Sequence, residues 1–166
     1  MMLNKQNNPE NLTEQYRLLK MQMTELLKEE TDWVANLANA SALLYNALPN
    51  INWVGFYLLK NGELILGPFQ GKPACVHIPV GKGVCGTAVE HDATQIVPDV
   101  HCFEGHIACD SDSASELVIP LHSETERKVV GVLDIDSPVQ NRFSNEDADA
   151  LEEIAAIIAK SCIWSN

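Results

Sequence analysis

The sequence predicts an α+β domain in which helices pack on one face of an antiparallel sheet. Two helical stretches come first, two pairs of strand-like segments joined by turns follow, and a capped helix comes last. The 166 residues and the hydrophobic fraction of 46% suffice for one domain with a sizeable core. We expect an N-terminal extension with the first helix over residues 1–30 and a single domain over residues 31–166.

Apolar residues recur at three- and four-residue spacing in two stretches near the N-terminus. The first set is Leu12, Tyr16, Leu19, Met23 and Leu26, and the second is Trp33, Leu37, Ala40, Leu44 and Leu48. This spacing predicts two amphipathic helices. We expect Thr31 or Asp32 to cap the second helix and Pro49 to end it. The apolar face of the first helix has two candidate partners, the domain itself and a second copy of the chain.

The remaining regular elements are predicted from strand composition and turn residues. Branched and aromatic residues predict strands over 51–59, 63–69, 75–80, 94–97, 116–121 and 128–136. Asn61-Gly62 predicts a tight hairpin between the first two. Glycines over 81–86 predict a turn into a short helix, whose free N–H groups can bind an anion such as a carboxylate. Ser144 and Asp147 form a capping box that begins the last helix.

Two aromatic residues share one face of the first predicted strand. They are Trp53 and Tyr57, and Gly55 lies between them on the same face. The glycine leaves a gap between the two rings, which predicts an aromatic slot for a ligand. The alternative is that both rings simply pack in the core, as large aromatic side chains usually do.

A polar loop over residues 97–115 carries several reactive side chains. It lacks both a helical apolar stripe and strand alternation, so it contributes little to a core. Polar loops of this length between regular elements are typically functional. We expect Cys109 of this loop to carry the chemistry. The aspartates Asp110 and Asp112 disfavour a Cys109 thiolate and His106 favours one, so the balance stays open.

Three acidic side chains lie at the ends of the last two predicted strands. Alternation puts Asp134 and Asp136 on one face of their strand, after an apolar run. If the connecting turn is centred near Thr125, Glu116 lies opposite Asp134, with Asp136 on the diagonal. Like charges this close are unfavourable unless one group holds a proton or a cation lies between them. The cluster therefore predicts a general acid or an ammonium site, and the alternative is that the carboxylates point into water.

Four of the five cysteines, Cys75, Cys85, Cys102 and Cys109, lie within 35 residues of one another. A zinc site is disfavoured because no CxxC pair is present, and we expect no metal and no other cofactor. Two alternatives remain, inert buried thiols and redox chemistry in which a second thiol resolves an oxidised cysteine as a disulfide. Cys162 lies in the last predicted helix, where we expect a structural role.

Composition excludes several classes of partner. The formal net charge of −12 disfavours nucleic acid, whose phosphates require clustered Lys and Arg. No stretch approaches the roughly 20 apolar residues that span a membrane. The first residues lack the apolar core of a signal peptide, so we expect a reducing cytoplasm. Cysteines in that compartment are more often catalytic or redox-active than part of a structural disulfide framework.

Several longer motifs resemble one known family. They are Gly81-Lys82-Gly83-Val84-Cys85-Gly86-Thr87-Ala88, His101-Cys102-Phe103-Glu104-Gly105-His106-Ile107-Ala108-Cys109-Asp110, Ser113-Ala114-Ser115-Glu116 and Leu133-Asp134-Ile135-Asp136-Ser137. Over residues 31–163 the chain resembles the free methionine-(R)-sulfoxide reductases built on a GAF domain. The resemblance implies a GAF fold, with six antiparallel strands flanked by helices, and a homodimer. It also implies reduction of free L-methionine (R)-sulfoxide through a cysteine sulfenic acid and an intramolecular disulfide that thioredoxin recycles.

The same resemblance assigns roles to the cysteines. Cys109 matches the attacking cysteine of the family, and Cys75 matches the cysteine usually assigned to resolution. Cys85 matches a third cysteine that can also pair with the attacking one. Cys102 has no matching role, so the partner of Cys109 stays open between Cys75 and Cys85.

The binding residues follow from the resemblance in the same way. Glu116, Asp134 and Asp136 match the acidic residues around the sulfoxide and the amino group. Trp53 and Tyr57 match the aromatic pocket for the substrate methyl group. These assignments agree with the acidic cluster and the aromatic face that the strand patterns predict.

Two other functions stay open from the residues alone. One is a non-catalytic GAF sensor of a small ligand, and the other is a thiol redox switch without a small substrate. The three cysteines at the motif positions favour the enzyme. Only the enzyme would release methionine from the sulfoxide, so this measurement distinguishes it from both alternatives.

Overall fold

A computed structural model describes residues 9–107 and 109–164 of the protein. Its helices are α1 (Pro9–Leu27), α2 (Trp33–Ala47), α3 (Gly83–His91) and α4 (Asn145–Ser161), with a short 3-10 helix over Val100–Cys102. Its strands are β1 (Trp53–Lys60), β2 (Glu63–Gln70), β3 (His77–Pro79), β4 (Gln95–Val97), β5 (Ser115–His122) and β6 (Val129–Ser137). Every predicted helix and strand is present, although β3 is shorter than the 75–80 expected.

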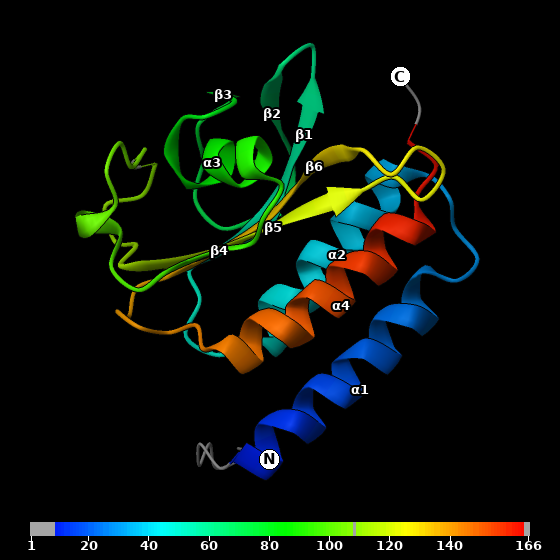
Figure 1. Ribbon diagram of the computed structural model, residues 1–166. Helices are drawn as coiled ribbons and strands as arrows, with labels where there is room; N and C mark the ends of the chain where they lie inside the picture. The colour runs from blue at the N-terminus through cyan, green and yellow to red at the C-terminus, as the bar shows by residue number, and fades with distance from the viewer. Residues whose placement is uncertain (1–8, 108, 165–166) are drawn as a thin grey trace.

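The six strands form one antiparallel sheet in the order β3-β2-β1-β6-β5-β4. Figure 1 shows α2 and α4 side by side on one face of this sheet, with α1 outside α4. The short helix α3 lies on the opposite face. The predicted six-stranded antiparallel sheet flanked by helices is therefore confirmed. The narrower prediction of helices on one face is incomplete, because α3 covers the other.

Each face of the sheet has its own hydrophobic core because the side chains of β1 alternate. Val54, Phe56 and Leu58 join the larger core with α1, α2 and α4. Trp53 and Tyr57 point the other way and join the smaller core under α3. The smaller core forms the wall of the pocket described below.

Helix α1 packs along α4 of the same chain (Figure 1). Its buried face consists of Tyr16, Leu19, Met23 and Leu27. The prediction that Leu26 continues this face is wrong. Leu26 is exposed, and Leu27, four residues after Met23, points inward instead. Contacts within one chain therefore cover the predicted apolar stripe, and the homodimer stays a prediction.

Two predicted helix caps are present. Asp32, not Thr31, caps α2, because its side chain accepts a hydrogen bond from the Ala35 N–H at 2.9 Å. Ser144 and Asp147 form the reciprocal capping box of α4. Both caps satisfy backbone N–H groups that the first turn of a helix leaves unpaired.

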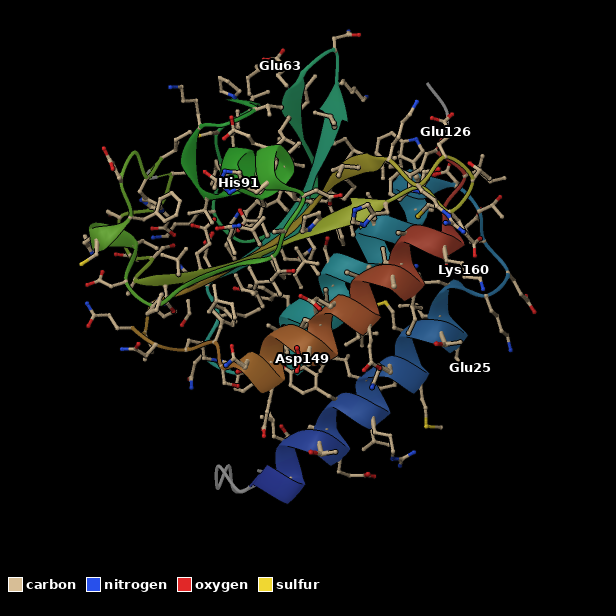
Figure 2. All side chains as sticks on the ribbon, viewed as in Figure 1. Glu25, Glu63, His91, Glu126, Asp149 and Lys160 are labelled. Atoms are coloured by element: carbon tan, nitrogen blue, oxygen red, sulfur yellow. A yellow bond between two sulfur atoms is a disulfide. The ribbon has the colours of Figure 1, made fainter. Side chains whose placement is uncertain are left out.

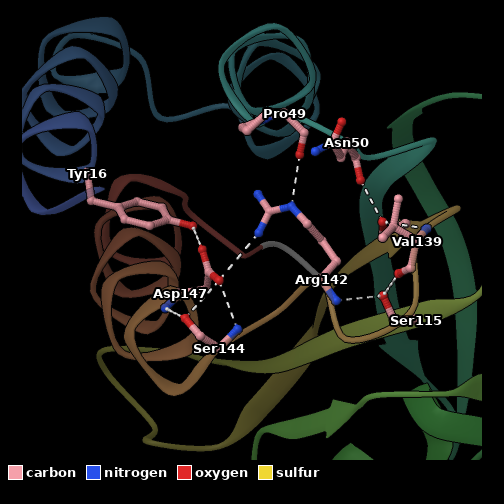
Figure 3. Close-up of polar contacts among 9 residues, drawn as sticks. Tyr16, Pro49, Asn50, Ser115, Val139, Arg142, Ser144 and Asp147 are labelled. Carbon is pink, nitrogen blue, oxygen red and sulfur yellow. Dashed lines mark hydrogen bonds and ion pairs between the residues drawn. The ribbon is translucent and has the colours of Figure 1, made fainter. Parts of the chain in front are cut away.

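Asp147 is also the centre of a buried polar network that joins α1, α4 and the segment after β6 (Figure 3). The Tyr16 hydroxyl donates to Asp147 Oδ1 at 2.5 Å, and Arg142 Nη1 lies 3.3 Å from Asp147 Oδ2. Arg142 Nε donates to the Pro49 carbonyl oxygen at 2.9 Å. Burial opposes ionisation of Asp147, but hydrogen bonds from Ser144 and Tyr16 and the charge of Arg142 hold its pKa below the usual value.

Two buried serines fasten the neighbouring ends of β5 and β6. The Ser115 hydroxyl donates to the Val139 carbonyl oxygen at 2.5 Å (Figure 3). The Ser137 hydroxyl donates to the Asn50 carbonyl oxygen at 2.6 Å. Each serine is next in sequence to one of the predicted acidic residues, so these bonds fix the strand ends that carry the site.

Acidic side chains such as Glu25, Glu126 and Asp149 are exposed and point away from the sheet (Figure 2). They contribute to the net charge of −12 without opposing the fold. Among the described residues, no helix combines the length and the apolar character that crossing a membrane requires.

Candidate active site

The ends of β5, β6 and β1 bring the three predicted acidic residues together. Glu116 of β5 pairs with Asp136 of β6, and Asp134 of β6 pairs with Gly55 of β1. The prediction that Glu116 faces Asp134 directly is wrong by two residues. The turn is centred beyond Thr125, and the pairing register also shifts between Leu121 and His122, at the end of β5. A shift of two keeps the side chains on the predicted face, because strand side chains alternate with a period of two.

One pocket on the α3 face of the sheet collects the predicted residues. Its lining includes Trp53, Tyr57, Cys85, Cys109, Glu116, Asp134 and Asp136. Cys75 is the one predicted site residue outside this lining, and it is covalently bonded to Cys109. The structure therefore brings all eight predicted site residues to one place.

Removal from water changes the acidity of the three carboxyl groups. Burial, with the charge of Asp136, raises the pKa of Glu116 to about 8. Burial and the adjacent Glu116 carboxyl raise the pKa of Asp134 well above its usual value. Asp136 is half-buried by exposure, yet loss of solvent and the charge of Asp134 raise its pKa as well. The cluster therefore holds protons at neutral pH, in place of three full charges.

Asp134 presents a free acceptor to this pocket. Its side chain is buried, and its Oδ1 has no hydrogen-bond partner among the described residues. A buried acceptor without a partner is unfavourable by about 1–3 kcal/mol. A ligand that donates a hydrogen bond or carries a positive charge would remove this penalty.

His106 contacts the acidic cluster. Its Nε2 lies 3.3 Å from Glu116 Oε2, and both side chains are largely buried. Burial lowers the pKa of His106, so the ring is neutral near pH 7. A neutral ring hydrogen-bonds to the Glu116 carboxyl but adds no positive charge in favour of a Cys109 thiolate.

Cys85 lies in the first turn of α3, against the carboxyl groups. Its sulfur and the carboxyl oxygens of Glu116 and Asp134 lie within 4.8 Å of one another. Burial, with the charges of Asp134 and Glu116, raises the pKa of the Cys85 thiol well above its usual value. The thiol is therefore protonated at neutral pH and weakly nucleophilic. These three donors are the only cluster of metal-ligating side chains in the described parts of the chain, and the absence of a metal stays a prediction.

A disulfide joins two loops at the pocket. Cys75 and Cys109 are bonded, with their Cα atoms 5.8 Å apart. Cys85, Cys102 and Cys162 are free, and only Cys102 of these three is exposed. Of the two partners that the sequence left open for Cys109, this structure therefore pairs Cys75.

The aromatic face is more closed than predicted. The rings of Trp53 and Tyr57 are stacked, with centroids 6.0 Å apart. The predicted gap over Gly55 is filled by Phe69 of β2, whose ring lies 5.2 Å from that of Trp53. A Cβ on Gly55 would clash with the Phe69 Cβ, so the glycine permits this close packing. The rings thus form a packed wall of the pocket, without a slot between them.

The polar ends of the same rings hold the loop that carries Cys75. Trp53 Nε1 donates to the Lys72 carbonyl oxygen at 3.1 Å. The Tyr57 hydroxyl donates to the Cys75 carbonyl oxygen at 3.0 Å. The two residues therefore position a cysteine, a role that the sequence analysis missed.

The glycine turn before α3 binds its own backbone. The N–H groups of Gly81, Lys82 and Gly86 donate to carbonyl oxygens of the same segment at 2.9–3.1 Å. The prediction that this whole turn offers free N–H groups to an anion is therefore wrong for these three residues. Gly83 and Val84, at the start of α3, line the pocket.

The pocket is small in this disulfide-bonded form. Its volume is about 40 Å³, which suits a few water molecules. Pro73 and Ala74 line it from the Cys75 loop, and His106 and Ile107 line it from the Cys109 loop. The two loops that the disulfide joins therefore cover the acidic cluster.

Asn52 is a functional candidate that the sequence analysis missed. Its Nδ2 donates to Asp110 Oδ2 and to Ser113 Oγ, each at 3.2 Å. The Asn52 Oδ1 atom is buried without a hydrogen-bond partner in the described chain. No local pattern marks this residue, and its place directly before Trp53 is the one available signal.

The fold and the pocket define the class to which the protein belongs. A six-stranded antiparallel sheet with helices on both faces carries a pocket of cysteine and carboxyl side chains under α3. The model of the GAF domain family matches residues 22–162. The chain is a GAF-domain protein, and its predicted boundary between residues 30 and 31 stays a prediction.

Known proteins that are similar to this chain identify its family within the GAF-domain class. Free methionine-R-sulfoxide reductase from Escherichia coli (strain K12) is 53% identical over 150 residues, which cover 90% of this chain and 90% of that protein. The reduced form of fRMsr from Staphylococcus aureus superposes with a TM-score of 0.86 at 53% identity, covering 97% of this chain and 98% of that one. Free methionine-R-sulfoxide reductase from Neisseria meningitidis, in complex with its substrate, gives a TM-score of 0.86 at 43% identity, covering 97% and 95%. This chain belongs to the free methionine-R-sulfoxide reductase family.

Proposed function

We propose that this protein reduces free L-methionine (R)-sulfoxide to L-methionine, with Cys109 as the nucleophile. The observation that carries the proposal is the Cys75–Cys109 disulfide beside a pocket of three carboxyls and two aromatic rings. The activity named for the Escherichia coli relative and the substrate complex of the Neisseria meningitidis relative support the same reaction.

The acidic cluster suits the amino group of a free amino acid. An ammonium group that enters the pocket favours the ionised form of a neighbouring carboxyl group, which then releases its proton and pairs with the ammonium as a carboxylate. Asp134, with its unpartnered Oδ1, and Asp136 are the groups that we assign to this ammonium. The walls formed by Trp53 and Tyr57 suit the apolar methyl group on the substrate sulfur. An N-acylated substrate lacks the positive charge and leaves the carboxyls without a partner.

Glu116 is the candidate proton donor. The sulfoxide oxygen must gain protons before it can leave the substrate sulfur. A carboxyl group whose pKa is about 8 holds a proton at neutral pH and can release it to such an oxygen. Neutral His106, 3.3 Å away, supports the protonated form without adding charge.

The reaction has two chemical steps on the protein. The Cys109 thiolate attacks the sulfoxide sulfur, methionine leaves with its sulfur reduced, and Cys109 becomes a sulfenic acid that carries the oxygen. The Cys75 thiol then attacks the Cys109 sulfur. An S–S bond forms, the S–O bond breaks, and the oxygen leaves as water.

Cys75 is the better candidate for resolution than Cys85. Cys75 is the bonded partner of Cys109 in this structure. Burial, with the neighbouring Asp134 and Glu116, raises the pKa of the Cys85 thiol, so its thiolate is scarce at neutral pH. Cys85 therefore serves better as part of the pocket wall.

Thioredoxin is the proposed electron donor, since exchange with a dithiol returns Cys75 and Cys109 to their reduced forms. We also propose a homodimer as the assembly and the cytoplasm as the compartment. The homodimer is what the resemblance to the family implies, and redox-active cysteines suit the reducing cytoplasm.

A coupled assay tests the proposed function. NADPH oxidation is followed with thioredoxin and thioredoxin reductase on free L-methionine (R)-sulfoxide, on its (S) epimer and on an N-acetylated (R) substrate. We expect turnover with the free (R) compound alone. Equal turnover with the N-acetylated compound would remove the role of the carboxyls in binding an ammonium, and no turnover with any compound would favour a ligand sensor or a redox switch.

A further inference from the structure

An ion-pair cluster joins the same two loops that the disulfide joins. Lys72 Nζ, from the loop after β2, lies 2.6 Å from Asp112 Oδ2 and 3.6 Å from Asp110 Oδ1. We name these three residues the Lys72 clasp. Lys72 precedes Cys75 by three residues, and Asp110 directly follows Cys109. The clasp therefore lies close to both cysteines in sequence and joins the two loops that carry them.

Asp110 is the fixed part of the clasp. Its side chain is only 9% exposed. Its Oδ1 accepts from the Asp112 N–H at 2.9 Å, and its Oδ2 accepts from Asn52 Nδ2 at 3.2 Å. These bonds order the turn that follows Cys109 and anchor it to the start of β1.

The opposite loop is anchored to the same strand. Trp53 and Tyr57 of β1 donate to the carbonyl oxygens of Lys72 and Cys75. Hydrogen bonds therefore fix the backbones of both loops. The Lys72 side chain, which is 62% exposed, extends from the Cys75 loop to the Cys109 loop. Hydrogen bonds with Asp112 and the charge of Asp110 raise the pKa of Lys72, so the ammonium persists at neutral pH.

We infer that Lys72 is a positioning residue for disulfide formation, because its ammonium holds the Cys109 loop against the Cys75 loop while the disulfide is open. The inference rests on the proposed function and deepens it. In the step concerned, the Cys75 thiol attacks the Cys109 sulfenic acid, the S–S bond forms and water leaves. A covalent link cannot align its own thiols during the step that makes it, whereas an ion pair survives reduction.

Electrostatics explains why a cation belongs at this position. Asp110 and Asp112 are two carboxylates immediately after Cys109, in a chain with a net charge of −12. Without Lys72 they repel each other, and no charge draws them toward the Cys75 loop. A tether that keeps two groups close raises their effective concentration, which speeds their reaction without any new contact at the reacting atoms.

A single-turnover experiment on the full chain tests the inference. Reduced wild type and Lys72→Met are mixed with one equivalent of free L-methionine (R)-sulfoxide, without thioredoxin. Methionine, the Cys75–Cys109 disulfide and the Cys109 sulfenic acid, trapped by a dimedone-type reagent, are measured over time by mass spectrometry. We expect methionine to form at the wild-type rate, whereas disulfide formation slows by about two- to fivefold, the size typical of losing an exposed ion pair. Trapped sulfenic acid should rise accordingly.

Matched variants separate charge from packing. Lys72→Arg keeps the cation, so it should form the disulfide at close to the wild-type rate. Lys28→Met removes the exposed Lys28–Glu25 ion pair at the end of α1 and should change nothing. The exchange Lys72→Asp with Asp112→Lys should recover part of the lost rate. In 1 M NaCl the wild type should approach Lys72→Met, because the Debye length falls to about 3 Å, while Lys72→Met itself should barely respond.

Several outcomes would overturn the inference. Disulfide formation at the wild-type rate in Lys72→Met, with methionine released normally, removes the positioning role but leaves the proposed function intact. Slow disulfide formation in Lys72→Met and Lys72→Arg alike, with no salt dependence in the wild type, assigns the effect to side-chain packing. Absence of methionine in the wild type rejects the proposed function, and this inference with it.

Discussion

Glu116 differs from the surface carboxylates of this acidic chain because protein atoms have replaced its water. It is 5% exposed, and its neighbours are a neutral histidine and further carboxyls. In such surroundings the charged form is unfavourable, so the proton stays on up to a pH of about 8. A group with this property is an acid at the pH of a cell, which is the property that loss of a sulfoxide oxygen requires.

The pH dependence of methionine formation should report on Glu116. In single turnovers with free L-methionine (R)-sulfoxide, we expect the wild-type rate to fall above a pH of about 8, where Glu116 loses its proton. Glu116→Gln has no proton to transfer, so its rate should be lower by about 100-fold or more and should lose this decline. If Glu116→Gln kept the wild-type rate and the same decrease above pH 8, a group other than Glu116 would donate the proton.

The same residue predicts a change in stability with pH. Glu116 keeps its proton up to a pH of about 8 in the fold, but an exposed glutamate loses it near 4.5. Between these values the unfolded chain binds fewer protons, so the free energy of unfolding decreases as pH rises. Glu116→Gln avoids this loss, and its Tm should exceed that of the wild type by at least about 2 °C at pH 8.5. Thermal unfolding at pH 5 should show a smaller difference, and equal differences at both pH values would contradict the assignment.

Cys75 and Cys85 should differ sharply when each is replaced by serine. Cys75→Ser should release about one methionine per chain and then stall with thioredoxin, because the Cys109 sulfenic acid has lost its partner. Cys85→Ser should keep turning over, since its buried, protonated thiol is not needed for resolution. Methionine and NADPH measured together distinguish the two. Sustained turnover by Cys75→Ser would move the resolving role to Cys85.

The sequence patterns predicted which side chains lie together at the site, but not how far each one is buried. Alternation put Trp53 and Tyr57 on one face, and adjacency put Glu116 next to the Cys109 loop. Whether the carboxyls point into water depends on the cover supplied by α3 and two loops, which is a matter of long-range packing. Asn52 and Lys72 act through contacts with residues 58 and 40 positions away, so no local pattern could identify them.

At the scale of elements, helix ends and strand faces followed from sequence more reliably than strand register. The caps at Asp32 and Ser144 are local hydrogen bonds, so a few residues determine them. The pairing of Glu116 with Asp136 depends on the length and irregularity of the β5–β6 turn. With the turn centred at Thr125, the predicted partner of Glu116 was wrong by two residues. Its side chain still lies on the predicted face of the sheet, and only its neighbour on β6 differs.

The attachment of α1 should depend on one buried hydrogen bond. Tyr16→Phe removes the donor to Asp147 Oδ1 and leaves a buried carboxylate less well satisfied. We expect this variant to lose about 1–3 kcal/mol of unfolding free energy in urea denaturation. Arg17→Ala, which alters an exposed ion pair with Glu14 on the solvent side of α1, should leave the unfolding free energy nearly unchanged. Equal effects of the two substitutions would show that the buried network does not fasten the helix.

At the scale of the whole molecule, one covalent bond joins the loops that cover the site. The disulfide links residues 34 positions apart, in a chain whose two cores lie on opposite faces of one sheet. A closed loop of this length restricts the unfolded chain and contributes about 4 kcal/mol by the chain-entropy estimate. In the proposed cycle this bond breaks and forms again, so the stability of the protein should vary with its redox state.

Reduction should therefore lower the stability of the wild type. Urea denaturation with and without a dithiol reductant should give a smaller unfolding free energy for the reduced protein, by up to about 4 kcal/mol. Cys75→Ser cannot form the bond, so the reductant should not change its stability. Identical unfolding curves for oxidised and reduced wild type would contradict a Cys75–Cys109 disulfide as the resting link.

The most direct measurement is the methionine released when the reduced protein meets free L-methionine (R)-sulfoxide without thioredoxin, followed by mapping of the disulfide. We predict about one methionine per chain and one new Cys75–Cys109 bond, with no methionine from Cys109→Ser. Methionine formed by Cys109→Ser, or none formed by a folded and fully reduced wild type, would contradict Cys109 as the nucleophile of a methionine sulfoxide reductase.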